Sequence, residues 1–296
     1  MKVVHIDYKN VSPKVNDLSL ILGYFDGVHL GHKELINIAR KEARFGLGII
    51  TFDKPISSLI SNGKTPEVLS SLDDRFKIIS KLGVDYFCLF HIDKDFLSLS
   101  EIDFIEMLKK LNVREVFVGK DFRFGKGRIG DVNLLKDYFD TRVVDLKEFN
   151  NEKISAQNIK ELLMKGEVIL ANKLLGYNYQ ISGVVISGKG IGHKIGFPTF
   201  NVKMNDNYLL PRYGVYKTIA YINNVPHLSI TNVGVNPTVD SGNIPSIEVH
   251  LKEYENEEFD NISIEFLEFV RDEKKFASLE ELKNQIEEDT KKVFKK

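Results

Sequence analysis

The hydrophobic pattern of this chain changes near its middle, and this change is the strongest constraint on its fold. In the first half, short β-rich runs alternate with segments whose apolar residues recur at helical spacing. This alternation predicts a parallel sheet with helices on both faces, and such sheets bind ligands beyond the carboxyl ends of their strands. The predicted strands are Leu18–Leu22, Leu47–Phe52, Tyr86–Phe90, Glu115–Gly119 and Thr141–Val144. The helical stripes are Leu35, Ile38 and Ala39; Leu72, Phe76, Ile79 and Leu82, after a capping Ser71; and Ile105, Leu108 and Leu111.

The second half contains strand-like runs without helices between them. Turn residues separate these runs, and apolar residues alternate with polar ones, which predicts a small antiparallel barrel or sandwich. A helix closes the chain, with Ser278 as its cap, Glu281 three residues later, and an apolar face of Leu282 and Ile286. The predicted strands are Ile181–Ser187, Val215–Ile222, His227–Asn232, Ile247–Leu251 and Ile262–Leu267. A length of 296 residues suits two domains, which we place at 1–175 and 176–296.

Composition narrows the class of protein. The 41 Lys and Arg residues balance 42 Asp and Glu residues, and the net charge of −1 gives no electrostatic reason to expect nucleic acid or a membrane surface as a partner. The single cysteine, Cys88, lies in an apolar run, so we expect a buried thiol and a reducing compartment. The N-terminal residues do not resemble a signal peptide, and no apolar stretch reaches the ~20 residues of a membrane helix. We therefore expect a cytoplasmic protein.

The densest chemical cluster follows the first predicted strand and runs from Gly23 to His32. Two histidines, His29 and His32, stand three residues apart where a helix should begin. A helix N-terminus offers free N–H groups to phosphate, Gly31 permits close approach, and two imidazoles can stabilise charge on a phosphoryl group. A metal pair is the weaker interpretation, because no third ligand stands at a suitable spacing. The pattern predicts a phosphate site.

A second cluster, Gly188–Asn201, combines four glycines and two lysines with a Pro-Thr-x-Asn segment. It fits neither a Walker loop nor a dinucleotide fingerprint, because the spacing differs from both. Backbone N–H groups of such a loop can surround phosphate, although a hairpin connection is the simpler interpretation of glycines alone. The hydroxyl of Thr199 and the amide of Asn201 are suitable oxygen ligands for Mg²⁺.

These segments resemble the bacterial bifunctional riboflavin kinase/FAD synthetases. The Gly23–His32 segment is similar to the signature of the nucleotidyltransferase superfamily, and Gly188–Asn201 is similar to the flavokinase signature. Further matches occur in the order of the family. They are Thr51-Phe52 with Pro55, Val118–Gly127, Tyr213–Tyr216, Asn232–Thr238, Glu248–Leu251 and Phe269–Phe276.

The resemblance implies a nucleotidyltransferase domain that adenylylates FMN to FAD, followed by a barrel domain that phosphorylates riboflavin, both with ATP and Mg²⁺. It assigns transition-state stabilisation to His29 and His32 and the general base to Glu248, whose strand neighbours Ile247 and Val249 should point into the core. It places Arg271 on a loop that closes over the flavin. In the first domain it implies ATP or phosphate contacts by Gly23, Phe25, Asp26, Gly31, Ser155 and Lys160, and flavin or nucleotide contacts by Asp121, Phe122, Arg123 and Phe124. In the second it implies ATP contacts by Gly188, Lys189, Gly190, Gly192, Lys194 and Gly196, flavin contacts by Arg271 and Glu273, and Mg²⁺ ligands Thr199 and Asn201.

One segment departs from the family pattern. Ser155 and Ile159 match, but Ala156 and Gln157 replace hydroxyl residues, and Lys160 stands where the family carries an arginine. A lysine keeps the charge but loses the bidentate fork that grips phosphate. This departure favours one alternative, a riboflavin kinase with a weak or lost adenylyltransferase site. Two further alternatives are a non-catalytic flavin-binding regulator and nucleotidyl transfer to another small phosphate. The last explains only the first half, and no pattern predicts the oligomeric state.

Overall fold

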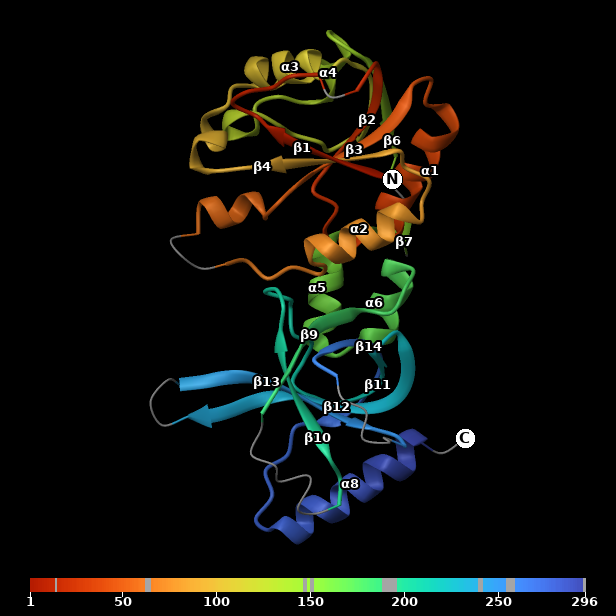
Figure 1. The fold of residues 1–296 in the computed structure, drawn as a ribbon, viewed down its shortest axis with the longest axis vertical. Coiled ribbons are helices and arrows are strands. Elements are labelled where there is room, and N and C mark those ends of the chain that lie inside the picture. Colours follow the sequence, from red (N-terminus) through yellow and green to blue (C-terminus); the bar gives the residue numbers. More distant parts are fainter. Residues whose placement is uncertain are drawn as a thin grey trace. The chain divides into compact units, whose positions relative to one another are not determined.

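The computed structural model divides into two compact units, Met1–Ala156 and Gln157–Lys296 (Figure 1). It describes residues 1–13, 15–61, 65–145, 148–149, 152–187, 196–238, 242–253 and 259–294. The boundary at 175/176 expected from the sequence stays a prediction, since the two units divide within a helix that precedes it. None of the helices formed by the described residues combines the length and the apolar character needed to cross a membrane.

The first unit is built on a six-stranded sheet in which every neighbouring pair is parallel. Its strand order, β1-β4-β3-β2-β5-β6, reverses between β2 and β5, which are neighbours in space but far apart in sequence. Such a reversal opens a crevice beyond the carboxyl ends of the two strands. Five strands were predicted, and β1 was missed. The strands are β1 (Lys2–Asp7), β2 (Leu18–Leu22), β3 (Gly46–Phe52), β4 (Tyr86–His91), β5 (Val113–Gly119) and β6 (Asp140–Val144).

Helices cover both faces of this sheet, as predicted. Alternate residues of β2 enter separate cores: Ile21 packs with α1 and α2, whereas Leu20 and Leu22 pack with α3 and α4. Ser71 caps α2 through a reciprocal pair of hydrogen bonds with Asp74. The helices are α1 (Leu30–Glu42), α2 (Leu72–Ser80), α3 (Glu101–Lys110) and α4 (Val132–Lys136), with single turns η1 (Asp26–Val28), η2 (Ile56–Leu59), η3 (Lys94–Ser98) and η4 (Lys126–Arg128) and a hairpin of β7 (Glu148–Phe149) and β8 (Glu152–Lys153).

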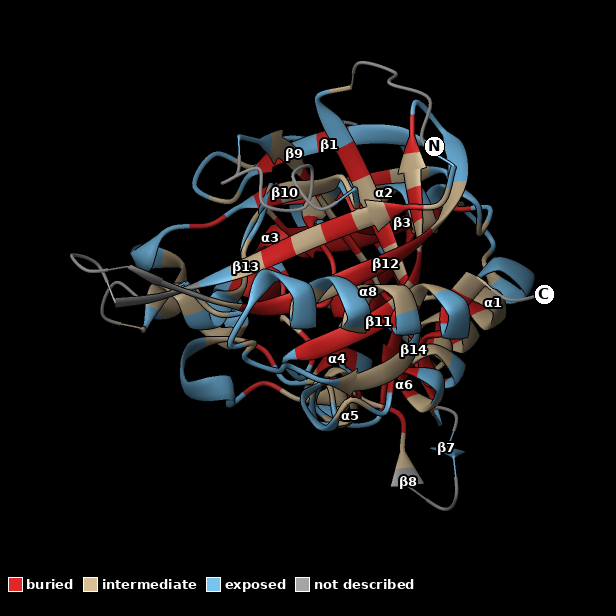
Figure 2. Ribbon diagram, turned by 90° about the horizontal axis from the view of Figure 1, so that it is seen from below, coloured by how far each residue is buried: buried red, intermediate tan, exposed pale blue. Residues whose placement is uncertain are grey.

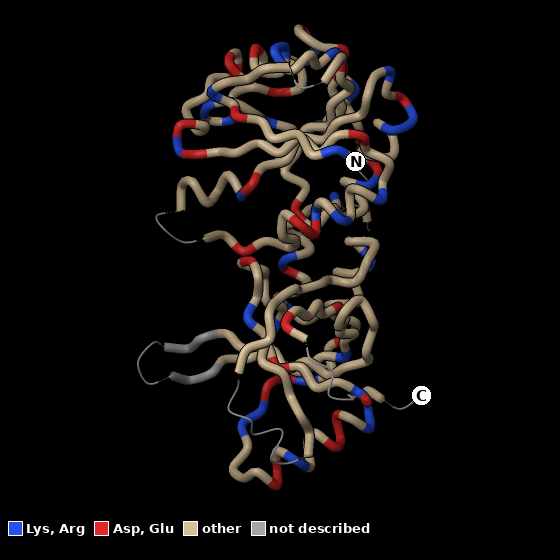
Figure 3. The backbone as a smooth tube through the Cα atoms, viewed as in Figure 1, with Lys and Arg blue, Asp and Glu red and all other residues tan. Residues whose placement is uncertain are grey.

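Cys88 lies inside this sheet with 2% of its surface exposed, which confirms the predicted buried thiol. Burial raises the pKa of the thiol to about 12, so it is protonated at neutral pH and has little nucleophilic character. Acidic and basic residues are interspersed along the backbone of both units (Figure 3). The near-zero net charge therefore reflects mixing of positive and negative residues within each unit.

The second unit is a closed antiparallel barrel with the order β10-β13-β12-β11-β14-β9, which decides between the barrel and the sandwich. Ile247 and Val249 are buried in its wall while Glu248 and His250 face outward, as the alternation predicted. Strand β10 was not predicted. The elements are α5 (Ala156–Lys165), α6 (Val168–Leu175), β9 (Gln180–Ile186), β10 (Thr199–Met204), β11 (Gly214–Ile222), β12 (Val225–Thr238), β13 (Gly242–Leu251), β14 (Asn261–Asp272) and α8 (Leu279–Phe294).

The terminal helix α8 packs against the outside of the barrel. Ser278 accepts a hydrogen bond from the backbone N–H of Glu281 at 3.2 Å, which confirms it as the cap. Val293 contacts Val215 and Ile230, and the opposite side of the helix is exposed (Figure 2). The inner side of α8 and the outer face of the barrel thus enclose a space between them.

Candidate active sites

The turn after β2 is held in a strained backbone conformation. Phe25 has φ +61° and Val28 has φ +36°, a region that β-branched residues strongly disfavour. The carboxylate of Asp26 fixes the turn by accepting hydrogen bonds from the backbone N–H groups of Leu69 at 2.8 Å and Ser70 at 3.2 Å. Strain of this kind persists only where the surroundings enforce it, and it is concentrated at functional sites.

This turn delivers His29 and His32 to the start of α1 as a stacked pair. Their ring centroids are 3.7 Å apart, and the His32 ring also makes an edge contact with Phe25. His29 caps the helix, because its Nδ1 accepts the backbone N–H of His32 at 3.4 Å. In a neutral ring the proton then resides on Nε2, which makes Nε2 of His29 a hydrogen-bond donor. The buried Nδ1 of His32 has no hydrogen-bond partner among the described residues. Such an atom suits a ligand.

Both histidines are held neutral. Burial, together with the positive charges of Lys153 and Lys33, lowers the pKa of His29 to about 4. Burial, His29 and Lys153 hold the pKa of His32 well below its usual range. The pair therefore offers neutral N–H donors beside two lysines, a combination that attracts anions and hydrogen-bonds them.

The lowered pKa of His29 predicts that acid destabilises the first unit. His29 binds a proton near pH 6.5 in the unfolded chain but only near pH 4 in the folded chain. The contribution of neutral His29 to the free energy of unfolding is therefore fully present above pH 6.5 and is lost as the pH falls from 6.5 towards 4. At about pH 5 the loss amounts to ~2 kcal/mol. The free energy of unfolding, measured with urea near neutral pH and near pH 5, should differ less between the two pH values in His29→Gln than in the unaltered protein. The exposed His91→Gln is the control, and an equal difference in His29→Gln would contradict the assignment.

The glycines around the pair have packing roles. A Cβ at Gly31 would lie 3.2 Å from the His29 ring, and a Cβ at Gly23 would lie 2.8 Å from the Phe25 ring. Phe25 itself is 1% exposed and belongs to the core. The predicted contacts of Gly23, Phe25, Asp26 and Gly31 with ATP stay predictions.

Arg75 is a residue of this region that the sequence interpretation missed. Its guanidinium is 1% exposed and donates to the carbonyl oxygens of Tyr24 at 3.1 Å and Phe52 at 3.2 Å, and to the hydroxyl of Thr51. It also lies over the Tyr24 ring at 4.5 Å. Arg75 thus joins the carboxyl ends of β2 and β3. The only signal was a cation inside the apolar stripe of Leu72 and Ile79.

The segment after β5 contributes the other side of the crevice. Asp121 forms an ion pair with Lys153, the lysine whose charge acts on both histidine rings. Partial burial would raise the pKa of Asp121, but the hydrogen bond and charge of Lys153 lower it overall. Phe122 stacks on the buried Phe124 at 5.8 Å, and the side chain of Arg123 is exposed. Ser155 lies in the first unit and Lys160 on α5 in the second unit, so the predicted contacts of these two with ATP phosphates remain predictions.

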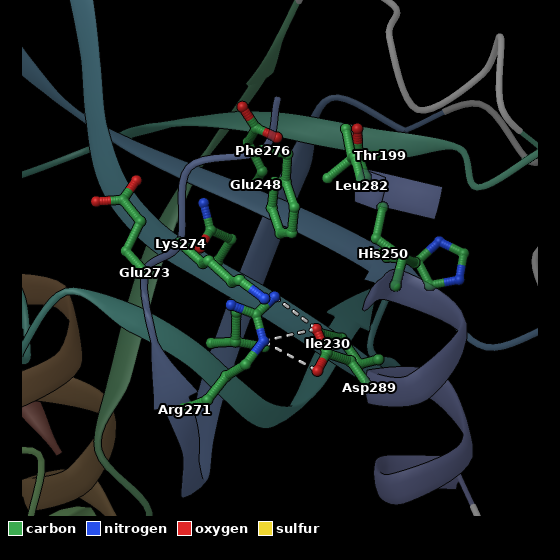
Figure 4. Close-up of a pocket in the computed structure, with 13 residues that line it drawn as sticks. Thr199, Ile230, Glu248, His250, Arg271, Glu273, Lys274, Phe276, Leu282 and Asp289 are labelled. Carbon is green, nitrogen blue, oxygen red and sulfur yellow. Dashed lines mark hydrogen bonds and ion pairs between the residues drawn. The ribbon is translucent and has the colours of Figure 1, made fainter. Parts of the chain in front are cut away.

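The second unit holds a cavity of about 240 Å³ between the barrel wall and α8 (Figure 4). The strand register explains what lines it. Glu248 is paired with Asn201 on one side and Asn232 on the other, and Asn232 is paired in turn with Val215 and Val215 with Arg271. These five residues form one row across five strands. Of the residues predicted from the sequence, Thr199, Glu248, Arg271 and Glu273 line the cavity.

Two of the other residues that line the cavity, His250 and Asp289, make polar contacts and were not among the predicted site residues. His250 is paired with Thr199, and its Nδ1 donates to the carbonyl oxygen of Pro198 at 2.9 Å. Asp289, on α8, forms an ion pair with Arg271. The motif around Glu248 was a signal for His250, and an acidic residue on the apolar side of α8 was the signal for Asp289.

One expectation for this site is wrong, and several lie outside the described residues. Arg271 belongs to strand β14 rather than to a loop, because the ladder with β11 extends to Asp272. Gly196 is exposed with φ +86°, and a Cβ there would meet no atom within 4 Å. The predicted ATP contacts of Gly188, Lys189, Gly190, Gly192 and Lys194 fall outside the described residues.

Comparisons with known proteins match the two parts of the chain to two different families. Residues 12–161 match the family model of FAD synthetase, and residues 175–296 match that of riboflavin kinase. The proteins named bifunctional riboflavin kinase/FMN adenylyltransferase from Listeria monocytogenes and Bacillus subtilis are 35% and 36% identical to the chain, and each match covers 98% of this chain and 96% of the relative. A solved structure described as a macrolide-efflux protein from Streptococcus pneumoniae has 27% identity and a TM-score of 0.90, with complete coverage of both chains. The last match shows that the fold is shared.

Proposed function

The chain belongs to the family of bifunctional riboflavin kinase/FMN adenylyltransferases, and from that membership we propose how its residues divide the chemistry. The second unit phosphorylates riboflavin to FMN with ATP. The first unit joins FMN to the AMP part of a second ATP, which gives FAD and pyrophosphate. The observation that carries the assignment of residues is the row that pairs Glu248, which lines the cavity, with Asn201 on one side and Asn232 on the other.

In the kinase step the terminal hydroxyl of riboflavin attacks the γ-phosphorus of ATP. The new O–P bond replaces the bond to the β-phosphate oxygen, ADP leaves, and Glu248 accepts the hydroxyl proton. Because the transition state of phosphoryl transfer is loose, orientation of the hydroxyl by Glu248 contributes as well as deprotonation. The register supports this role, since Glu248 faces the cavity and not the barrel core.

The residues beside Glu248 fit Mg²⁺. Thr199 and Asn201 stand on the same face of β10, and Asn201 is directly opposite Glu248, so hydroxyl and amide oxygens are brought near a carboxylate. Hard oxygen donors of this kind suit Mg²⁺, which typically takes one or two protein ligands and completes its shell with phosphates and water. When bound, Mg²⁺ would neutralise charge on the ATP phosphates. Thr199 and Asn201 would hold it.

In the adenylyl transfer step a phosphate oxygen of FMN attacks the α-phosphorus of ATP. The bond to the β-phosphate breaks and pyrophosphate leaves, so no covalent enzyme intermediate is needed. His29 and His32 donate hydrogen bonds to the charge that develops at the α-phosphate. Their neutral state, the strained turn and the adjacent Lys153 support this role, and Ser155 of the same unit would contact the departing phosphates.

Replacing Gly234 by Ala is expected to raise the KM for riboflavin several-fold with little loss of stability. A Cβ at this position would lie 2.1 Å from Oε1 of Glu273, the predicted flavin contact. Because Glu273 is exposed, its side chain can move away, and the free energy of unfolding should fall by less than ~1 kcal/mol. Kinase assays with riboflavin and with ATP as the varied substrate, together with a melting curve, test this. An unchanged KM for riboflavin would remove Glu273 from the flavin site.

The assay for the whole proposal uses the purified chain with riboflavin, ATP and Mg²⁺, followed by chromatographic separation of the flavins. FAD is the expected product. Accumulation of FMN alone would indicate a lost adenylyltransferase site, in line with Ala156, Gln157 and Lys160. No product at all would indicate a flavin-binding regulator.

The ligands of the protein in this proposal are riboflavin, FMN, FAD and ATP, and its location is the cytoplasm. Neither nucleic acid nor a membrane is among the proposed partners. The interspersed charges support this, because polyanion-binding surfaces gather lysine and arginine on one face (Figure 3).

A further inference from the structure

The cavity of the second unit is bounded on one side by an ion pair between a strand and the terminal helix (Figure 4). Arg271, near the end of β14, donates from Nε to both carboxylate oxygens of Asp289 at 3.0 Å and from Nη2 to Oδ2 at 2.7 Å. The side chain of Asp289 is 6% exposed and that of Arg271 is 23% exposed. This bidentate ion pair is largely shielded from water, and it fixes the plane of the Arg271 guanidinium.

The carboxylate of Asp289 is itself held in place. Gln285, one turn earlier on α8, donates to its Oδ1 at 3.2 Å. Val293, one turn later, packs against Val215 and Ile230 of the barrel wall. The position of Asp289 relative to the cavity is therefore set by the docking of the whole helix.

The ion pair leaves part of Arg271 available. A guanidinium has five N–H groups. Asp289 takes one on Nε and one on Nη2, and the carbonyl oxygen of Asp272 takes one on Nη1 at 2.9 Å. Among the contacts of the described residues, one N–H on each Nη remains, and Arg271 lines the cavity.

The backbone positions of Arg271 and Glu248 lie at a defined separation along one row of the barrel. The row runs from Glu248 through Asn232 and Val215 to Arg271, which is three strand spacings, or about 14 Å along the barrel wall. A substrate whose reacting hydroxyl lies at Glu248 and whose ring system extends along the row would present its ring acceptors near Arg271.

We propose that Asp289 is a positioning residue of the kinase site, which orients the guanidinium of Arg271 so that its two remaining N–H groups meet acceptor atoms of the flavin ring. This rests on the proposed function, in which Arg271 contacts flavin. Asp289 acts through Arg271 and does not touch the substrate. Removal of the Asp289 carboxylate should therefore weaken riboflavin binding but leave the turnover number at saturating riboflavin unchanged.

The test is a double-mutant cycle on riboflavin binding, measured by titration calorimetry without ATP. Asp289→Asn should weaken binding at least ~10-fold, the expected value of a lost charge-assisted contact, and should raise the KM for riboflavin but not that for ATP. In an Arg271→Met background the same change should cost less than ~2-fold, because the residue through which it acts is gone. Glu280→Gln, the corresponding change at an exposed residue of α8 outside the cavity lining, is the matched control.

The outcomes separate the two levels of the proposal. If Arg271→Met leaves riboflavin binding unchanged, the flavin contact of the proposed function is wrong. If Arg271→Met weakens binding and Asp289→Asn does not, or if the two losses add fully, the positioning role of Asp289 is wrong. Should Asp289→Asn fail to fold because it leaves a buried cation, Asp289→Glu tests the same point with the charge retained, and weakened binding is again expected.

Discussion

Glu248→Gln is expected to lower riboflavin phosphorylation at least ~100-fold, the lower end of the range for loss of general base catalysis. Glutamine has the shape of glutamate and keeps one oxygen as an acceptor, but it cannot accept the hydroxyl proton. The KM values for riboflavin and ATP should change little, because the neighbouring Asn201 and Asn232 are untouched. Initial rates of FMN formation, with both substrates saturating, measure the effect.

The same protein provides an internal control for this variant. Adenylylation of added FMN by the first unit should continue at its normal rate, because Glu248 belongs to the other unit. Glu268→Gln, an exposed residue on β14 outside the cavity lining, is the matched substitution and should leave both activities unchanged. A turnover number of Glu248→Gln within a few-fold of the unaltered enzyme would show that Glu248 is not the base.

His32→Ala is expected to have the opposite selectivity. Formation of FAD from FMN and ATP should fall at least ~100-fold, the effect of removing one preorganised donor to a developing oxyanion, and riboflavin phosphorylation should be unaffected. The orphaned Nδ1 of His32, stacked against His29, is the atom for which the transferred phosphate would be the partner.

Alanine also leaves a cavity beside His29, so a second variant separates chemistry from packing. His32→Phe keeps a ring against His29 and Phe25 but has no donor, and we expect it to be as inactive as His32→Ala with a higher melting temperature. His91→Ala, an exposed histidine of the same sheet, is the control. Equal loss of adenylyl transfer and phosphorylation in His32→Phe would contradict the separation of the two sites.

Periodicity was sufficient for elements with several buried residues, and two strands were missed for other reasons. The stripe of Leu35 and Ala39 and the alternation around Glu248 each determined a face correctly. Strand β1 was missed because Val4 and Ile6 are the only buried residues among its six. Strand β10 was missed because its residues were assigned to the loop motif that precedes them.

The site residues found from the sequence were those with unusual chemistry in a compact motif. Arg75 and Asp289 were not found because each is a single charged residue within a helix. Both occupy positions where an apolar residue would complete the stripe: Arg75 beside Leu72 and Ile79, Asp289 beside Ile286 and Val293. A lone charge at such a position is a usable signal. The row from Asn201 to Arg271 was out of reach, because the register of five strands depends on which strands pair.

The two sheets differ in whether they have edge strands. The barrel closes on itself through the pairing of β9 with β10, whereas the parallel sheet ends at β1 and β6. Lys2, His5 and Asp7 on β1, and Asp140 and Arg142 on β6, are exposed and charged or polar at those ends. Charged residues on an outer strand discourage a further strand from adding. Substitutions that neutralise these side chains are therefore expected to lower the solubility of the protein before they lower its activity.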